Sequence, residues 1–481
     1  MASVHEHDEA GVRRLTLDNP PLNPLADTLL EALVAALDRA EADRVEALVL
    51  IGAGDTFVAG ADIRRLEVLA RGESRGASTS PPGVAPERPR PALGELIRRL
   101  EDWPAPVVAA IDGFALGGGL ELALGCHHRV ATDEARLGLP ELALGLIPGA
   151  GGTQRLPRLI GLEAAMELML SSRQLEAEEA LARGLVDELA PRVELLAVAT
   201  RAARRLTGAP LRRTRLLGDR VETGEAAQAL ADAARGALTR EQRLARFPTL
   251  CLDATLAGAL EGAERGLEVE RACFRECLED PAAAAMIYLF FAARTAKKAG
   301  AKLRGAEAEP LLRRLLEPLA EATAWLASQG ASLQEIEGEL EAFGWSLEPV
   351  MDFYMEIIGA QRVGDARRDP SASASSASGQ GSCSVPREEW LPRLLYPLVS
   401  GACQALAEGA AARASDLDLA LHLGAGFPKL RGGPMKWADR LGPAAVLEAL
   451  ARWHQASGAV VFQPSPALEA RAKRGCGFTD E

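Results

Sequence analysis

Two glutamates in apolar surroundings, Glu121 and Glu141, are the residues of this sequence best suited to chemistry. Glu121 lies in ALGGGLELALG at 115–125, and Glu141 follows Pro140 in LGLPELALGLIPG. A carboxylate beside apolar walls has a raised pKa and can exchange protons near neutral pH. Two such groups suit a reaction in which one gives a proton and the other takes one.

Three glycine-rich segments accompany these glutamates: FVAGADI at 57–63, ALGGGLELALG at 115–125 and IPGAGGTQRL at 147–156. Each lies near the junction of an apolar strand and a helix, where backbone N–H groups stabilise negative charge. Two such turns aimed at one point would form an oxyanion hole. An enolate held there between two carboxylates suits addition or removal of water next to a thioester. The alternative is that the glycines serve turns and packing, and that Glu121 only complements a helix dipole.

The elements that must position these residues alternate between strand and helix from about residue 11 to 190. VRRLTL, EALVLIG and PVVAAIDG are predicted strands, LADTLLEALVAALDRAEA is an amphipathic helix, and GGGLELALG opens another helix. This is α/β patterning. The Ser-, Pro- and Gly-rich stretch at 72–91 is predicted to be a flexible surface insertion. Residues 195–298 are dense in Ala, Leu, Arg and Glu and predict successive helices.

A second helical region begins near Glu309 and is divided by a polar linker at about 364–384. The pieces that flank the linker repeat the same residue types at similar spacing, which predicts a duplicated helical unit packed as a pseudo-twofold pair. The corresponding residues are Pro318 and Pro397, Gly330 and Gly409, Gly344-Trp345 and Gly426-Phe427, Pro349 and Pro434, and Gly359 and Gly442.

Composition sets the class of protein. A chain of 481 residues predicts more than one domain, and a net charge of −13 argues against a nucleic-acid partner. No run of about 18 apolar residues predicts a membrane span. The start is not that of a signal peptide, so we expect a cytoplasmic protein. The seven cysteines are scattered, and Cys273 and Cys277 lack further ligands nearby, so we expect free thiols and no metal site.

At the glycine-rich segments and the two glutamates, the sequence resembles the crotonase (enoyl-CoA hydratase/isomerase) superfamily. NPPLNPL at 19–25, FVAGADI and the run from 115 to 161 extend the likeness over nearly all of residues 10–190. It is especially similar to the hydratase part of multifunctional fatty-acid β-oxidation enzymes of the peroxisomal bifunctional type. FGWSLEPVMDFYMEIIG at 343–359, LYPLVSGACQALAEG and GFPKLRGGPMKWADRLG resemble the C-terminal unit of 3-hydroxyacyl-CoA dehydrogenases in those enzymes.

The resemblance implies an α/β crotonase-type (ββα superhelix) domain, then linker helices and an all-α duplicated dehydrogenase C-terminal-like domain. It gives the boundaries 1–195 for the hydratase domain, 196–305 for the helical linker region, 306–365 and 387–481 for the two helical repeats, and 366–386 for the flexible linker.

The resemblance also implies roles for individual residues. Ala61 and Gly118 match the backbone donors of the oxyanion hole, and Glu121 and Glu141 match the carboxylate pair that positions water and exchanges the α proton. Gly149 is expected to help aim a helix dipole at the thioester. The further substrate-binding residues are Ala59, Asp62, Ile63, Gly117, Pro140 and Gly149.

The family's NAD-binding Rossmann domain has no counterpart here. Only about ten residues separate Lys298 from Glu309, and no G-x-G-x-x-G occurs. We therefore expect acyl-CoA as substrate, no cofactor, and hydration of trans-2-enoyl-CoA in fatty-acid β-oxidation without dehydrogenase activity. The alternatives are a Δ3-Δ2-enoyl-CoA isomerase or other crotonase chemistry, and a non-catalytic scaffold that docks a separate dehydrogenase or thiolase. A monomer is expected rather than a trimer.

Overall fold

The computed structural model describes residues 2–70, 92–346 and 383–480 of the chain. They form two compact units, Met1–Ala283 and Ala284–Glu481. The insertion predicted at 72–91, the linker predicted at 366–386 and most of the segment at 343–359 lie outside the described residues. The five domain boundaries given above stay predictions.

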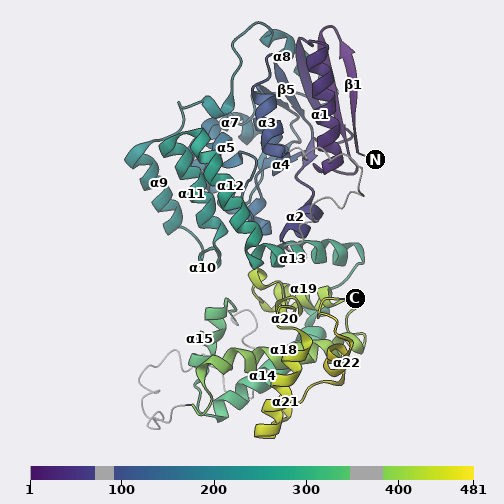
Figure 1. Ribbon diagram of the computed structural model, residues 1–481, viewed down its shortest axis with the longest axis vertical. Helices are drawn as coiled ribbons and strands as arrows, with labels where there is room; N and C mark the ends of the chain where they lie inside the picture. Colours follow the sequence, from purple (N-terminus) through teal and green to yellow (C-terminus); the bar gives the residue numbers. More distant parts are fainter. Residues whose placement is uncertain (1, 71–91, 347–382, 481) are drawn as a thin grey trace, which may run out of the picture. The chain divides into compact units, whose positions relative to one another are not determined.

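The first unit is built on a six-stranded sheet in the order β1-β2-β3-β5-β7-β10. β1 and β2 are antiparallel, and the other neighbours are parallel. Two of the central strands, β3 and β5, are short apolar runs, and these strands and β7 are almost entirely buried. The helix α8 (Leu195–Leu206) packs its apolar side on this sheet, while α1 (Asp27–Ala42) lies beside β1 and β2 (Figure 1). The strands are β1 (Ser3–Glu9), β2 (Val12–Asp18), β3 (Ala47–Gly52), β5 (Val107–Ile111), β7 (His128–Ala131) and β10 (Glu188–Leu189).

A second, smaller sheet positions the candidate site. Its order is β4-β6-β8-β9, with β4, β6 and β8 parallel and β9 antiparallel. The three parallel strands are followed by α2 (Ile63–Ala70), α4 (Gly118–Leu124) and the 3-10 helix η1 (Glu141–Leu144). Because the carboxyl ends of parallel strands meet at one edge of a sheet, the three strand-to-helix turns lie side by side. The strands are β4 (Val58–Ala59), β6 (Phe114–Leu116), β8 (Arg136–Gly138) and β9 (Leu175–Glu176).

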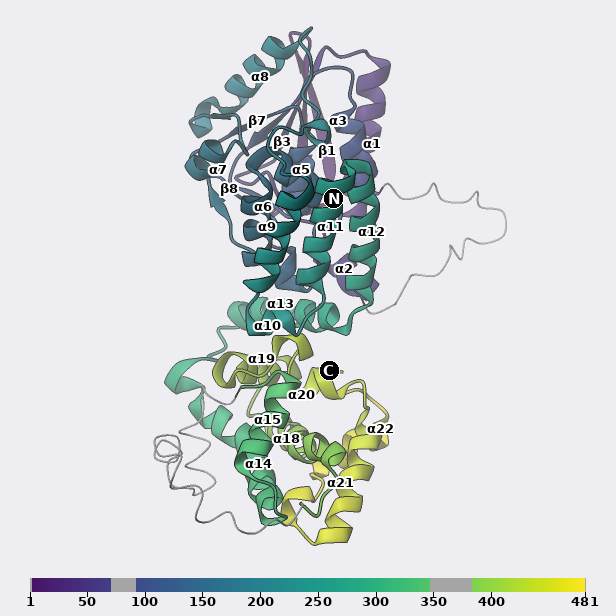
Figure 2. The ribbon, with the colours of Figure 1, turned by 90° about the vertical axis from the view of Figure 1, so that its left-hand side faces the viewer.

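Helices complete the first unit. The pair α11 (Phe247–Glu261) and α12 (Ala263–Glu279) lie side by side and both contact α5 (Gly152–Ile160), as Figure 2 shows for this part of the chain. The other helices are α3 (Leu93–Glu101), α6 (Leu162–Ser171), α7 (Ala177–Arg183), α9 (Gly224–Gly236) and α10 (Arg240–Arg243).

The described residues of the second unit form helices and no strand. α14 (Glu309–Ser328) and α18 (Trp390–Ala407) are its central pair, and Gly401 lets Pro318 approach, since a Cβ there would lie 2.9 Å from the proline ring. The other helices are α13 (Pro281–Lys298), which begins in the first unit, α15 (Leu333–Phe343), α19 (Ala414–Ala425), α20 (Pro434–Ala438), α21 (Pro443–Ser457) and α22 (Pro466–Arg474).

The internal repeat stays a prediction, but several of the residues that it pairs lie in comparable places in this packing. α14 and α18 each carry one of the paired prolines, Pro318 and Pro397. Trp345 and Phe427, which correspond in the two copies, contact each other with ring centroids 4.8 Å apart. The Trp345 indole N–H also donates to the Ala425 carbonyl at 2.8 Å. The predicted order of an α/β domain followed by an all-helical one is confirmed. In the part of the chain that the structure describes, no helix is long and apolar enough to cross a membrane.

Candidate active site

The turn between β6 and α4 brings Glu141 to the glycine run. Gly117 has φ +51, a left-handed conformation that side chains disfavour, and a Cβ there would lie 3.1 Å from Glu141 Oε1. The Gly117 N–H donates to the Gly138 carbonyl at 2.9 Å, which ties this turn to the end of β8. Glycine at 117 therefore lets the Glu141 carboxyl lie against the backbone that leads into α4.

Two backbone N–H groups without a protein acceptor meet beside this turn. A Cβ built on Gly118 would lie 3.6 Å from the Ala61 nitrogen, so the two residues adjoin. Within the described ranges, neither the Ala61 N–H nor the Gly118 N–H donates a hydrogen bond. The side chains of Leu25 and Leu93 lie on the same side of Gly118. An oxyanion at this point would meet two donors beside an apolar wall.

The sequence motif at 19–25 supports the Ala61 turn. The Ala59 N–H donates to the Leu22 carbonyl and the Leu25 N–H to the Gly60 carbonyl, both at 3.0 Å. Asn23 is buried, and its side-chain amide donates to the backbone carbonyls of Ala53 and Thr56. Hydrogen bonds with residues 22–25 thus fix the backbone just before Ala61, and the Ala61 N–H is not used in them.

Glu121 is a buried carboxylate held by a helix N-terminus. Its side chain is 3% exposed, and Oε1 accepts from the N–H groups of Ala150 and Gly152, both at 2.8 Å. Burial raises the pKa of Glu121, while these two donors and the nearby Arg155 oppose the rise. The N-terminus of α5 therefore favours the ionised form of this group.

Glu141 is also buried, but its carboxyl group is less well supplied with donors. Its Oε2 is buried and forms no hydrogen bond within the described part of the chain. Burial raises the pKa of Glu141 well above its ordinary value, and the negative charge of Glu121 raises it further. The pKa of Glu141 is therefore raised further than that of Glu121, so Glu121 is the group that ionises more readily and Glu141 the one that keeps its proton more strongly.

The other predicted residues line the same turns. Ala59 ends β4, Asp62 accepts from the Arg64 N–H at 3.0 Å, Ile63 begins α2, and Pro140 directly precedes Glu141. The structure therefore brings the predicted residues of the three turns together. Their roles in binding a substrate stay predictions.

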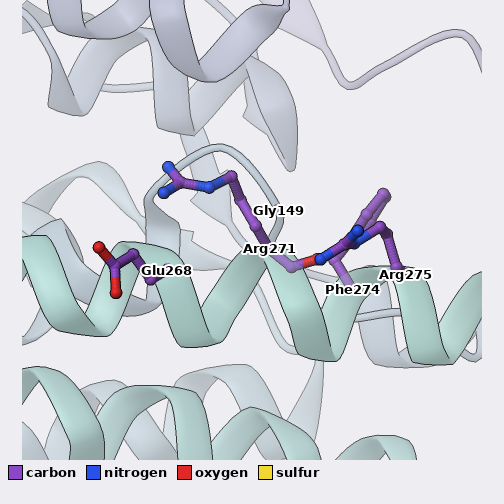
Figure 3. Close-up of a pocket in the computed structure, with 5 residues that line it drawn as sticks. All are labelled: Gly149, Glu268, Arg271, Phe274 and Arg275. Carbon is purple, nitrogen blue, oxygen red and sulfur yellow. The ribbon is translucent and has the colours of Figure 1, made fainter.

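Gly149 lies at a pocket that the sequence did not reveal. The pocket has a volume of about 590 Å³, and a Cβ on Gly149 would collide with the Phe274 ring (Figure 3). The N–H groups of the four residues that follow Gly149 donate to the carboxyl groups of Glu121 and Glu270. The positive end of the α5 dipole therefore faces these two side chains. The lining residues are Gly149, Glu268, Arg271, Phe274 and Arg275.

Glu270 is a third buried carboxyl group at this site, and the sequence reasoning missed it. Its signal is an acidic residue on the buried stripe of α12. The buried positions of that helix are Gly266, Leu267, Glu270, Cys273 and Cys277. Both cysteines are free thiols.

A match to a known family gives the class of protein to which this fold and site belong. Residues 7–243 match the family described as enoyl-CoA hydratase/isomerase. Residues 391–477 match the family described as 3-hydroxyacyl-CoA dehydrogenase, C-terminal domain. The chain belongs to the enoyl-CoA hydratase/isomerase family through its N-terminal half and carries a dehydrogenase C-terminal domain after it. Between the two matches, the described residues form helices and no strand, so no Rossmann domain is seen there.

Curated relatives include multifunctional enzymes. The chain is 38% identical over 303 residues to the glyoxysomal fatty acid beta-oxidation multifunctional protein MFP-a of Cucumis sativus, which covers 62% of this chain and 40% of that protein. It is 38% identical over 295 residues to the peroxisomal bifunctional enzyme of Danio rerio, covering 61% and 38% respectively. It is 39% identical over 309 residues to the fatty acid oxidation complex subunit alpha of Shewanella amazonensis, covering 62% and 42%.

The chain thus spans about two fifths of the length of these relatives. Among solved structures, the enoyl-CoA hydratase from Bacillus anthracis is 30% identical, with a TM-score of 0.37. That likeness covers 57% of this chain and 89% of the other.

Proposed function

We propose that this chain hydrates trans-2-enoyl-CoA to 3-hydroxyacyl-CoA. The observation that carries the proposal is the pair of buried carboxyl groups, of which Glu141 has the more strongly raised pKa, next to two backbone N–H groups that donate no hydrogen bond within the described residues. Addition of water across a polarised double bond needs a base for the water, an acid for the α carbon and donors for the thioester oxygen. Glu121, Glu141, and the N–H groups of Ala61 and Gly118 are suited to these roles.

In the proposed reaction, the thioester oxygen accepts hydrogen bonds from Ala61 and Gly118, which stabilise the enolate as charge develops. Ionised Glu121 accepts a proton from water while the water oxygen bonds to the β carbon. Protonated Glu141 gives its proton to the α carbon, and the C=C double bond becomes single. Passage of the proton from Glu121 back to Glu141, directly or through solvent, restores the starting state.

The cationic pocket supports an acyl-CoA substrate. Arg271 and Arg275 are exposed, and neither forms an ion pair with another described residue. Their guanidinium groups line a cavity next to Gly149, three residues before α5 begins. The phosphates of a CoA thioester carry the opposite charge and suit bidentate binding by arginine.

We further propose that the chain does not oxidise its product and uses no cofactor. The helical character of the described residues between the two family matches supports this, because a dinucleotide domain needs a parallel sheet. Isomerisation of 3-enoyl-CoA is proposed as a side activity, because one carboxyl group such as Glu141 can move a proton between two carbons.

Partners and assembly are also proposals. The helical second unit suits docking to a separate dehydrogenase or thiolase, either in addition to catalysis or, as the alternative, instead of it. We keep the predictions of a monomer and of a cytoplasmic protein. The names of the relatives above give glyoxysomal and peroxisomal proteins together with one from the bacterium Shewanella amazonensis.

The test is the loss of enoyl-thioester absorbance when purified protein is added to crotonyl-CoA, then to decenoyl-CoA, without NAD. Prompt loss with 3-hydroxyacyl-CoA as product supports hydration. Folded protein that leaves both substrates unchanged would refute it. Faster turnover of 3-enoyl-CoA than of 2-enoyl-CoA would make the isomerase the main activity, and NADH formed on adding NAD would overturn the proposed lack of dehydrogenase activity.

A further inference from the structure

The turn that holds Glu121 is held by a second carboxyl group from a distant part of the chain. Glu270 lies on α12 and is 1% exposed. Its Oε1 accepts from the Gly151 N–H at 2.6 Å, and its Oε2 accepts from the Thr153 N–H at 3.1 Å and from the Thr153 hydroxyl at 2.5 Å. Three hydrogen bonds thus join Glu270 to the beginning of α5.

The N–H groups of this turn are divided alternately between the two glutamates. Ala150 and Gly152 donate to Glu121, whereas Gly151 and Thr153 donate to Glu270. Successive peptide groups at 150–153 are therefore fixed from two sides. A rotation of this turn that broke the bonds to Glu270 would also move the two donors that set the direction of the Glu121 carboxylate.

The Thr153 hydroxyl is fixed in turn. It accepts from the side-chain amide of Gln154 at 2.9 Å and donates to Glu270. Gln154 also donates to the Ala254 carbonyl of α11 at 2.8 Å. Ala254 of α11 and Glu270 of α12 thus contact the turn through a continuous set of hydrogen bonds, to which α12 contributes the carboxyl group of Glu270.

We propose that Glu270 is a positioning residue for the hydration reaction, because its carboxyl group fixes the turn at 150–153 and thereby orients the Glu121 carboxylate. The inference rests on the proposed function. Glu270 acts through Glu121 and has no assigned contact with substrate.

Glu270 also changes the charge around the pair. In the described part of the chain it has no ion pair, and burial together with the charge of Glu121 raises its pKa to about 8. Above about pH 8, where Glu270 ionises, its negative charge raises the pKa of Glu141 in turn. A neutral side chain at 270 should therefore let Glu141 lose its proton at lower pH. The titratable groups that face Glu270 are Glu121 on α4, Glu141 on η1, Arg155 on α5, Cys251 on α11 and Cys273 on α12.

The test compares Glu270→Gln with Glu279→Gln, a matched control on an exposed position of the same helix. The glutamine oxygen can still accept a hydrogen bond from the Gly151 N–H. Its amide NH₂ would face the Thr153 N–H, which is also a donor, so the hydrogen bond between residue 270 and the Thr153 backbone is lost. We expect Glu270→Gln to lower kcat for crotonyl-CoA by on the order of 10- to 100-fold with little change in KM. We also expect the alkaline limb of the pH profile to move to lower pH. Glu279→Gln should leave both unchanged.

Folded Glu270→Gln with a wild-type kcat and pH profile would overturn the inference. If that variant fails to fold, Thr153→Val decides, because it removes the hydroxyl contact to Glu270 and keeps the backbone contacts. An unchanged kcat and pH profile in Thr153→Val would then overturn it. Wild-type protein that is inactive on every enoyl-CoA would instead refute the proposed function, so the two failures are distinguishable.

Discussion

Replacement of Glu121 separates its chemical role from its structural one. In Glu121→Gln, the amide oxygen can keep both hydrogen bonds that Oε1 now accepts from Ala150 and Gly152, each 2.8 Å long. The substitution thus removes the charge and leaves the turn at the start of α5 in place. In Glu121→Ala, both N–H groups lose their acceptor in a buried environment.

The two variants should therefore differ in stability but not in activity. Loss of a general base lowers kcat by on the order of 10²- to 10⁴-fold, which is about 3–5 kcal/mol of activation free energy. A buried N–H without an acceptor costs about 1–3 kcal/mol, so alanine should be less stable than glutamine by roughly 2–6 kcal/mol. Glutamine should unfold no more easily than wild type.

The assay is crotonyl-CoA hydration at neutral pH, with denaturant unfolding of the same preparations as the stability measurement. Glu279→Gln serves as the control for a carboxyl lost elsewhere in the first unit. Activity of Glu121→Gln within a few-fold of wild type would show that Glu121 is not the base. Equal unfolding free energies for the alanine and glutamine variants would show that its carboxylate does not hold the turn.

Three further variants test other parts of the structure. Because burial raises the pKa of Glu141, the stability contributed by its proton is complete below the unfolded value of 4.5 and is lost as pH rises through the folded one. The unfolding temperature of Glu141→Gln should therefore exceed that of wild type by a margin that grows as the pH rises above the unfolded value, and a constant margin would contradict the raised pKa. The double change Arg271→Ala and Arg275→Ala should raise KM for crotonyl-CoA roughly 10-fold or more with kcat nearly unchanged, while Arg265→Ala on the same helix should not. Trp345→Ala should destabilise the second unit by about 3–5 kcal/mol, seen as a lower melting transition, and an unchanged transition would refute its role in packing the repeat.

The carboxylate pair could be predicted because its signals are local. Each parallel strand of the small sheet runs directly into a turn and then a helix, so the glycines and glutamates lie within a few residues of a recognisable strand. Strand β3 and strand β5 were predicted for the same reason, since each is a continuous apolar run. The strand β1 gives no such signal. Its residues, SVHEHDE, are polar and mostly exposed, and only pairing with β2 makes them a strand.

Glu270 and the arginine pocket could not be predicted from spacing. The Gly151 N–H and its acceptor Glu270 are separated by 119 residues along the chain. Their contact depends on how α12 packs against α5, which is a property of the fold and not of any local motif. A buried acidic residue on an apolar helical stripe is still informative, because burial of a carboxyl group needs donors from somewhere. The stripe shows that such donors exist, and only the structure shows where.

The carboxyl groups of Glu121, Glu141 and Glu270 differ in how strongly the N-terminus of α5 stabilises their ionised forms. A helix N-terminus offers roughly half a positive charge, which can stabilise about one anion. Glu121 receives two N–H donors and the field of Arg155, so it is the group best able to ionise. Glu141 receives no donor at Oε2 within the described residues, and its pKa is raised well above the ordinary value, so it keeps its proton more strongly than Glu121. The pKa of Glu270 is about 8, so this group is mostly protonated at neutral pH. The same turn that binds Glu121 therefore keeps Glu141 an acid, and ionisation of Glu270 above about pH 8 adds charge that strengthens this difference.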